Sequence, residues 1–188
     1  MSVVDFFRRC LNINYESLLR SVDDLSTEEL AWQPRPDCNS IGFLVWHYAR
    51  VLDFWFQTGI RHVPQLWEEG WAERFGRTPA KRGDIGFSFT AAQLQAFHVP
   101  DISELLGYAE ASRDTVLGHL KEVEDADLDT VQVTRGRDVT IPLSTLFEQL
   151  VWELNQHGGQ IAYLRGMQRG LVDRSYTGPV LMAAAGAG

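Results

Sequence analysis

The sequence is poor in cysteine and in positive charge, and both shortages exclude classes of protein. Cys10 and Cys38 are its only cysteines and no CxxC motif is present, which excludes a disulfide framework and predicts a reducing, cytoplasmic location. The 17 Lys and Arg residues against 25 Asp and Glu residues give a net charge of −8. Proteins that bind nucleic acid need a basic surface, so we expect no nucleic acid among the partners of this chain.

Long apolar runs are also missing. No segment approaches the ~20 consecutive apolar residues that a membrane-spanning helix needs, and residues 1–20 contain no apolar core of the kind found in signal peptides. Hydrophobic residues nevertheless make up 45% of the chain and aromatic residues 11%, which is too much for a disordered chain. We therefore expect a single globular domain over residues 1–171, with no contact to a membrane, followed by a C-terminal tail over 172–188.

Helical periodicity recurs in four segments, and no segment shows the sustained alternation of a strand. It predicts helices over residues 3–22, 40–58, 101–123 and 142–168. Asn39 or Ser40 is suited to cap the second helix, and Gly59 is suited to end it. Asp101 and Glu104 resemble a capping box at the start of the third helix. The pattern predicts an all-α fold, an antiparallel four-helix bundle with a long connection between the second and third helices.

The segments between these helices carry weaker signals. We expect a short helical turn near residues 25–30, short helices around 64–75 and 90–97 within the long connection, and a small extended excursion over 130–140. The residues beyond Tyr176 are mostly small, so we expect the tail to be mobile or docked on a partner chain.

Two ionisable residues lie on the apolar stripe of the fourth predicted helix. Glu153 follows Leu150 by three residues and His157 precedes Ile161 by four, so both side chains should point toward the core. Burying a carboxylate costs several kcal/mol unless it is paired or coordinated. Residues at i and i+4 of a helix are roughly 5–6 Å apart at Cβ, close enough for both side chains to reach one ion. The pair therefore predicts half of a metal site.

A third ligand must come from another helix, and His47 is the best candidate. It follows Leu44 by three residues and precedes Val51 by four, which places it on the apolar face of the second helix. His47, Glu153 and His157 together predict a site for one divalent metal ion. The alternative is a buried ion pair between Glu153 and His157, with His47 hydrogen-bonded elsewhere. A ferritin-like di-iron centre is disfavoured because the sequence contains no Glu-x-x-His motif.

The second and fourth predicted helices resemble those of the DinB-like superfamily of bacterial four-helix bundles. The similar stretches are Ser40–His47 continuing to Phe56, and Glu153–Ile161 continuing to Gly166. The resemblance extends over most of residues 1–171. It implies that a histidine on the second helix and two ligands four residues apart on the last helix bind Zn, Ni or a similar divalent ion, and we expect a homodimer.

Many members of that superfamily use three histidines, whereas this sequence has Glu153 as one of the three ligands. With a glutamate in this position, the sequence is similar to the branch of the superfamily that contains mycothiol-dependent maleylpyruvate isomerase and the mycothiol transferases. That branch implies a low-molecular-weight thiol as cosubstrate. Members of that branch typically carry a further histidine where this chain has Gln160. This difference leaves the three metal ligands unchanged and affects the substrate contacts and the residues around the metal.

Three protein ligands leave one coordination position open, which is typical of a catalytic site. A metal ion in such a site lowers the pKa of a bound thiol or water. We therefore predict a metal-dependent thiol S-transferase that acts on a small-molecule substrate. Arg50 and Arg165 are candidates to bind an anionic substrate group, with solvated arginines on the helix surface as the alternative. Asn14 is a candidate polar contact in the pocket, with a hydrogen-bonded core amide as the alternative. A metal-dependent hydrolase and a non-catalytic dimeric stress-response bundle are the competing functions.

Overall fold

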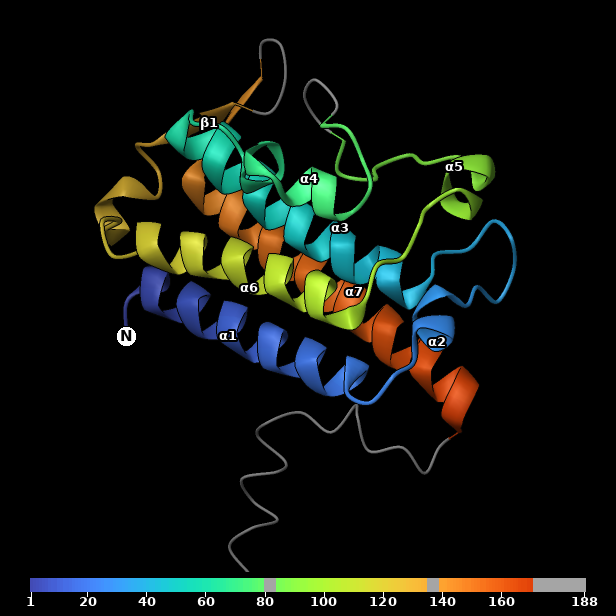
Figure 1. Cartoon of the computed structure of the whole chain (residues 1–188). Helices are drawn as coiled ribbons and strands as arrows, with labels where there is room; N and C mark the ends of the chain where they lie inside the picture. The colour runs from blue at the N-terminus through green and yellow to red at the C-terminus, as the bar shows by residue number, and fades with distance from the viewer. Residues whose placement is uncertain (80–83, 135–138, 171–188) are drawn as a thin grey trace, which may run out of the picture.

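Four long helices pack side by side and make up most of the molecule (Figure 1). The computed structural model describes residues 1–79, 84–134 and 139–170. The long helices are α1 (Val3–Val22), α3 (Ile41–Asp53), α6 (Ile102–His119) and α7 (Leu143–Arg169). Buried apolar side chains from all four helices join in one hydrophobic cluster. The prediction of a mainly helical chain is confirmed.

The predicted antiparallel bundle is wrong for one pair of neighbouring helices, α3 and α6. In the last turn of α3, Arg50 donates a hydrogen bond to the hydroxyl of Tyr108, and beyond the end of α3 Phe56 lies edge-on to His119. These contacts follow the same order along both segments, so α3 and α6 run parallel. The cause is the long connection between them, which returns along the molecule before α6 begins (Figure 1).

The pair formed by α1 and α7 is also parallel. Phe7 stacks on Phe147 with ring centroids 4.0 Å apart, and one turn before the end of α7, Arg165 donates to the carbonyl oxygen of Ser21 near the end of α1. By contrast, α7 is antiparallel to α3, since Phe147 packs near Phe56 while Glu153 reaches back to His47. This antiparallel packing of α7 on α3 positions the candidate site.

The central helix is α3, of which all 13 residues are buried. Ser40 caps it, because its hydroxyl oxygen accepts the backbone N–H of Phe43 at 3.2 Å. The helix does not end at Gly59 as predicted. It continues as a π-helix, η1 (Phe54–Arg61), which ends at His62 in the left-handed conformation. Short π-helical stretches are frequent at functional sites, and this one contributes to the wall of the pocket described below.

The predicted short helices are present. They are α2 (Thr27–Ala31) in the first link, and the 3₁₀-helix η2 (Leu66–Glu69), α4 (Trp71–Arg74) and α5 (Ala91–Gln95) in the long connection. Asp101 precedes α6, but its side chain makes no capping hydrogen bond, so the predicted capping box is wrong. The helix also ends at His119, before the predicted end at residue 123.

The extended excursion predicted between α6 and α7 is a two-stranded antiparallel hairpin. It follows a 3₁₀-helix, η3 (Asp125–Asp127), and pairs β1 (Gln132–Thr134) with β2 (Thr140–Pro142). The loop around residues 135–137 and the C-terminal tail over 172–188 lie outside the described residues.

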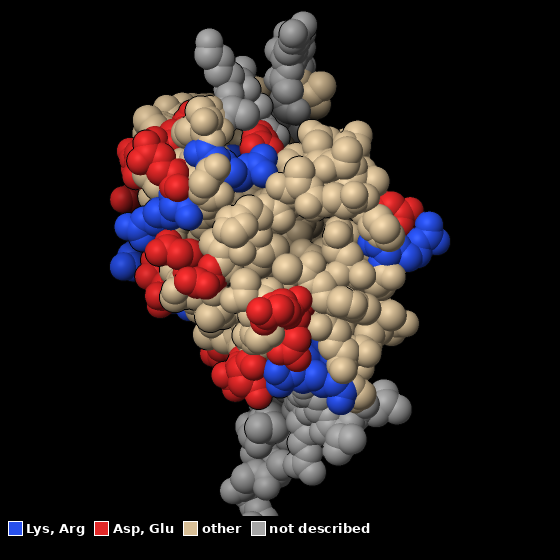
Figure 2. All heavy atoms as spheres, turned by 45° about the vertical axis from the view of Figure 1, so that its right-hand side comes forward, with Lys and Arg blue, Asp and Glu red and all other residues tan. Residues whose placement is uncertain are grey.

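None of the helices in the described ranges is long and apolar enough to cross a membrane. On the face shown in Figure 2, Lys and Arg side chains lie beside Asp and Glu side chains and do not gather into a basic patch.

Candidate metal centre

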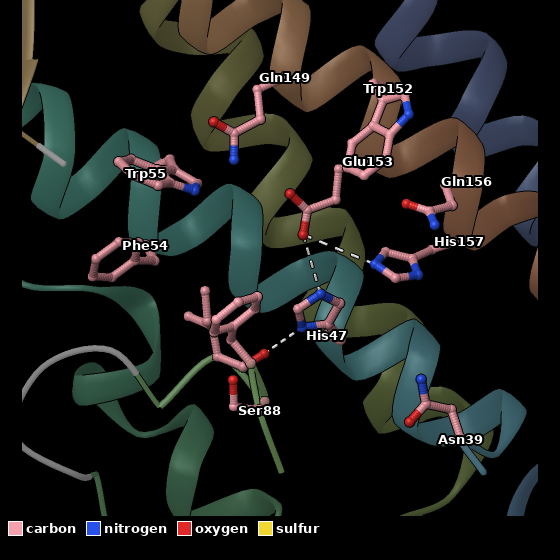
Figure 3. Close-up of a pocket in the computed structure, with 13 residues that line it drawn as sticks. Asn39, His47, Phe54, Trp55, Ser88, Gln149, Trp152, Glu153, Gln156 and His157 are labelled. Carbon is pink, nitrogen blue, oxygen red and sulfur yellow. Dashed lines mark hydrogen bonds and ion pairs between the residues drawn. The ribbon is translucent and has the colours of Figure 1, made fainter. Parts of the chain in front are cut away.

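The three predicted metal ligands meet between α3 and α7. Figure 3 shows Glu153 projecting from α7 toward His47 on α3, with His157 one turn further along α7. Oε1 of Glu153 lies 3.2 Å from Nε2 of His47 and 3.9 Å from Nε2 of His157. The ligand atoms of the three residues all lie within 4.8 Å of one another. No other group of three His, Cys, Asp or Glu residues in the described part of the chain is placed to share an ion.

A hydrogen bond behind each imidazole fixes which nitrogen faces the centre. Nδ1 of His47 is bonded to the carbonyl oxygen of Ile85, and Nδ1 of His157 lies 2.9 Å from Oε1 of Gln160. Carbonyl oxygens only accept, so each Nδ1 carries the proton and each Nε2 presents its lone pair to the centre. Metal-binding histidines in proteins are usually held in this way.

This donor set fits a divalent cation. Two Nε2 lone pairs and the Glu153 carboxylate oxygen are all acceptors, and three acceptors that converge need a shared cation or proton between them. A proton on one imidazole would satisfy a single contact, and burial lowers the pKa of the His157 side chain, which opposes its protonation. The alternative of a simple Glu153–His157 ion pair explains less, because Glu153 lies closer to His47 than to His157.

The ligands lie at a cavity of about 680 Å³. Aromatic side chains and uncharged polar side chains form most of its wall: Phe54, Trp55, Phe87 and Trp152, with Asn39, Ser88, Gln149 and Gln156. Glu153 and His157 remain partly accessible from it, with side chains 16% and 15% exposed. The centre is therefore open on one side to a molecule of moderate size.

The three predicted substrate contacts do not line this cavity. Asn14 donates to the backbone carbonyl of Cys10, one turn earlier on α1. Arg50 is 1% exposed and hydrogen-bonded inside the protein. Arg165 is also buried and bonds to Asp24 and to the end of α1. These positions give all three residues structural contacts, and the steering of an anionic substrate by Arg50 or Arg165 is not supported.

Sequence reasoning missed the segment 85–88, which forms one wall of the cavity and supplies the carbonyl that binds His47. Its local signal is Gly86, which has φ +85° and no room for a side chain, since a Cβ there would lie 2.8 Å from both Phe43 and Trp46. Only glycine adopts this conformation without strain. A glycine in an irregular connection is too common to mark a site, so the signal could not be used alone.

Comparison with known proteins gives a family and a shared fold. The family model of the DinB superfamily matches residues 11–161. The chain belongs to the DinB superfamily. The crystal structure of a conserved protein from Enterococcus faecalis superimposes with a TM-score of 0.77 at 21% sequence identity, covering 88% of this chain and 96% of that one. That likeness shows a shared fold. No curated protein sequence matches the chain.

His157 is expected to remain a neutral ligand at a mildly acidic pH. Protons compete with a metal ion for imidazole nitrogens, and an unperturbed histidine is half protonated at about pH 6.5. Burial lowers the pKa of His157, so its imidazole remains neutral and available below that pH. An NMR titration of the metal-free protein should show the His157 ring gaining its second proton only below the ordinary histidine pKa. A midpoint for His157 above the ordinary histidine pKa would contradict the expectation.

Proposed function

We propose that this protein binds one divalent metal ion through His47, Glu153 and His157 and serves as a metal-dependent thiol S-transferase. The observation that carries the proposal is the convergence of three acceptor atoms at an open cavity. Two histidines and one glutamate suit Zn²⁺ or Ni²⁺, which accept imidazole and carboxylate ligands. A bound ion of this kind would supply an open coordination position, at which the pKa of a thiol or water is lowered.

The residues of the chain define what such a site would accept. His47 and His157 are held with Nε2 toward the centre, so neither imidazole ring needs to turn over when an ion binds. The aromatic wall favours an electrophile with an apolar or planar group. The amides of Gln149 and Gln156, beside this wall, are suited to hydrogen-bond a polar cosubstrate. No Lys or Arg of the described residues lines the cavity, so we propose that the electrophile is uncharged.

A low-molecular-weight thiol is supported by Glu153, the ligand that resembles the mycothiol-dependent branch. The competing function is a metal-dependent hydrolase, which a specific observation also favours: two histidines and one glutamate hold the catalytic zinc of well-known peptidases. The two functions differ in the nucleophile, thiol or water, and can be separated by experiment.

The test is a thiol panel on metal-loaded protein. Mycothiol, bacillithiol and glutathione would each be offered with monochlorobimane, an uncharged electrophile, and adduct formation followed by fluorescence. We expect adduct formation with one thiol by the Zn²⁺- or Ni²⁺-loaded protein, and its loss in Glu153→Gln, which keeps the side-chain shape and removes the charge. Equal rates with metal-free protein would overturn the proposal. Ester hydrolysis without thiol transfer would favour the hydrolase, and inactivity in both assays a non-catalytic role.

A further inference from the structure

The carbonyl that binds His47 belongs to a segment that is held by a second residue of α3. Ile85 contributes that carbonyl, and the carbonyl oxygen of the preceding residue, Asp84, accepts a hydrogen bond of 3.0 Å from Nε of Arg50. His47 and Arg50 are three residues apart, so they lie on the same side of the helix. Two successive carbonyl groups of one irregular segment are thus bound by two side chains of one helix face.

Arg50 is itself fixed on all sides. Its remaining guanidinium nitrogens donate to Oε1 of Gln65 at 2.7 Å, to the hydroxyl of Tyr108 at 2.9 Å and to Oδ2 of Asp53 at 3.2 Å. The Asp53 carboxylate in turn accepts the Tyr108 hydroxyl and two backbone N–H groups at the start of η2. We call Arg50, Asp53, Gln65 and Tyr108 the Arg50 network. All four are buried.

The segment 84–88 has few other restraints. It forms no helix or strand, and Arg77 holds it at one end through an ion pair of 3.0 Å with the Asp84 carboxylate. Gly86 lies against Phe43 and Trp46 in its middle. Because the segment lacks a backbone ladder, the place of the Ile85 carbonyl depends on these side-chain contacts, and the bond from Arg50 is made to the backbone of the residue next to Ile85.

We infer that Arg50 is a positioning residue for the metal centre. By binding the Asp84 carbonyl, it holds the Ile85 carbonyl where it accepts the Nδ1 proton of His47, and so directs Nε2 of His47 toward Glu153. The inference rests on the proposed metal-binding function. In a purely structural role, the Arg50 network would only hold the long connection against α3 and α6. A substitution of Arg50 would then lower the metal affinity no more than any other substitution with the same loss of folding stability.

The test compares two destabilised variants. Arg50→Lys keeps a positive charge beside Asp53 but cannot donate to all of the Arg50 partners at once. Val116→Ala removes buried atoms from α6 at a residue that does not line the cavity. Denaturant unfolding of the metal-free proteins measures the free energy of unfolding of each variant and shows that the two are destabilised to a similar extent. Competition with a chromogenic chelator gives their Zn²⁺ affinities. We expect Arg50→Lys to bind Zn²⁺ about 10-fold more weakly and Val116→Ala to bind it as the unmodified protein does.

A second readout needs no metal. The ¹⁵N shifts of the His47 ring in the metal-free protein report its tautomer, which should be Nδ1–H in the unmodified protein and mixed in Arg50→Lys. If Arg50→Lys does not fold, Arg77→Met is the substitute, since Arg77 is partly exposed and holds the same Asp84 from its other side. Unchanged Zn²⁺ affinity together with an unchanged tautomer would overturn the inference. If the unmodified protein binds no divalent ion, the proposed function fails, and the tautomer still decides whether Arg50 positions His47.

Discussion

Replacing His47 with alanine is expected to abolish specific metal binding. His47 is the only ligand from α3, and without it Glu153 and His157 on α7 offer two ligand atoms, which is fewer than zinc sites in proteins use. A ligand that binds only the folded state stabilises it by about 2.7 kcal/mol at 100 times its dissociation constant. The His47→Ala protein should therefore lose both the bound metal and the rise in melting temperature that metal gives the unmodified protein.

The measurement is elemental analysis after dialysis, with thermal unfolding in the presence and absence of Zn²⁺ or Ni²⁺. His98→Ala is the matched control, because it removes an exposed histidine outside the group of ligands. It should retain the metal content and the thermal shift of the unmodified protein. Retention of metal by His47→Ala would show that the ion binds elsewhere, and the assigned centre would then be wrong.

Replacing Asp53 with alanine is expected to destabilise the fold by about 3–5 kcal/mol, the usual cost of removing one partner of a buried ion pair. Asp53 is 1% exposed and faces Arg50, whose charge would be left without its carboxylate. The backbone N–H groups of Leu66 and Trp67 would also lose their acceptor. Burial raises the pKa of Asp53 in spite of these bonds, so the pair itself adds little net stability.

Denaturant unfolding of the metal-free protein measures this loss. Tyr108→Phe is the comparison, because it removes one hydroxyl of the same network and leaves the Arg50–Asp53 pair in place. We expect it to cost about 1.5–3 kcal/mol, because the hydroxyl bonds to two charged groups. A loss from Asp53→Ala no greater than that of Tyr108→Phe would mean that water reaches Arg50 and that the network is not buried in solution.

The two ligands on α7 could be predicted from sequence because this helix has a buried stripe and an exposed side. Leu150 and Ile161 are fully buried, and Glu153 and His157 lie at the edge of their stripe, half-buried beside the cavity. The same reasoning was weaker for His47. Every residue of α3 is buried, so a position on an apolar face does not distinguish a ligand from a residue packed against any other helix.

The arginines show how little sequence proximity says about the contacts of a side chain. Arg50 and Arg165 are close in sequence to ligands, and a charged residue on a helix is usually solvated. In the structure both are buried, and their partners come from segments distant in sequence: Asp84 and Tyr108 for Arg50, and Ser21 and Asp24 for Arg165. No local pattern encodes such contacts, because they depend on how the chain returns to the same place.

The helical class, the four long helices and the spacing that places Glu153 and His157 on one side of α7 could be predicted from the amino-acid sequence, because these properties follow from local periodicity. Three features became known only from the folded chain: α3 and α6 run parallel, the segment 85–88 closes over His47, and both imidazoles present Nε2 to Glu153. Each of these depends on contacts between residues far apart in the chain. A helical repeat specifies which side of a helix is buried, but not what lies against it.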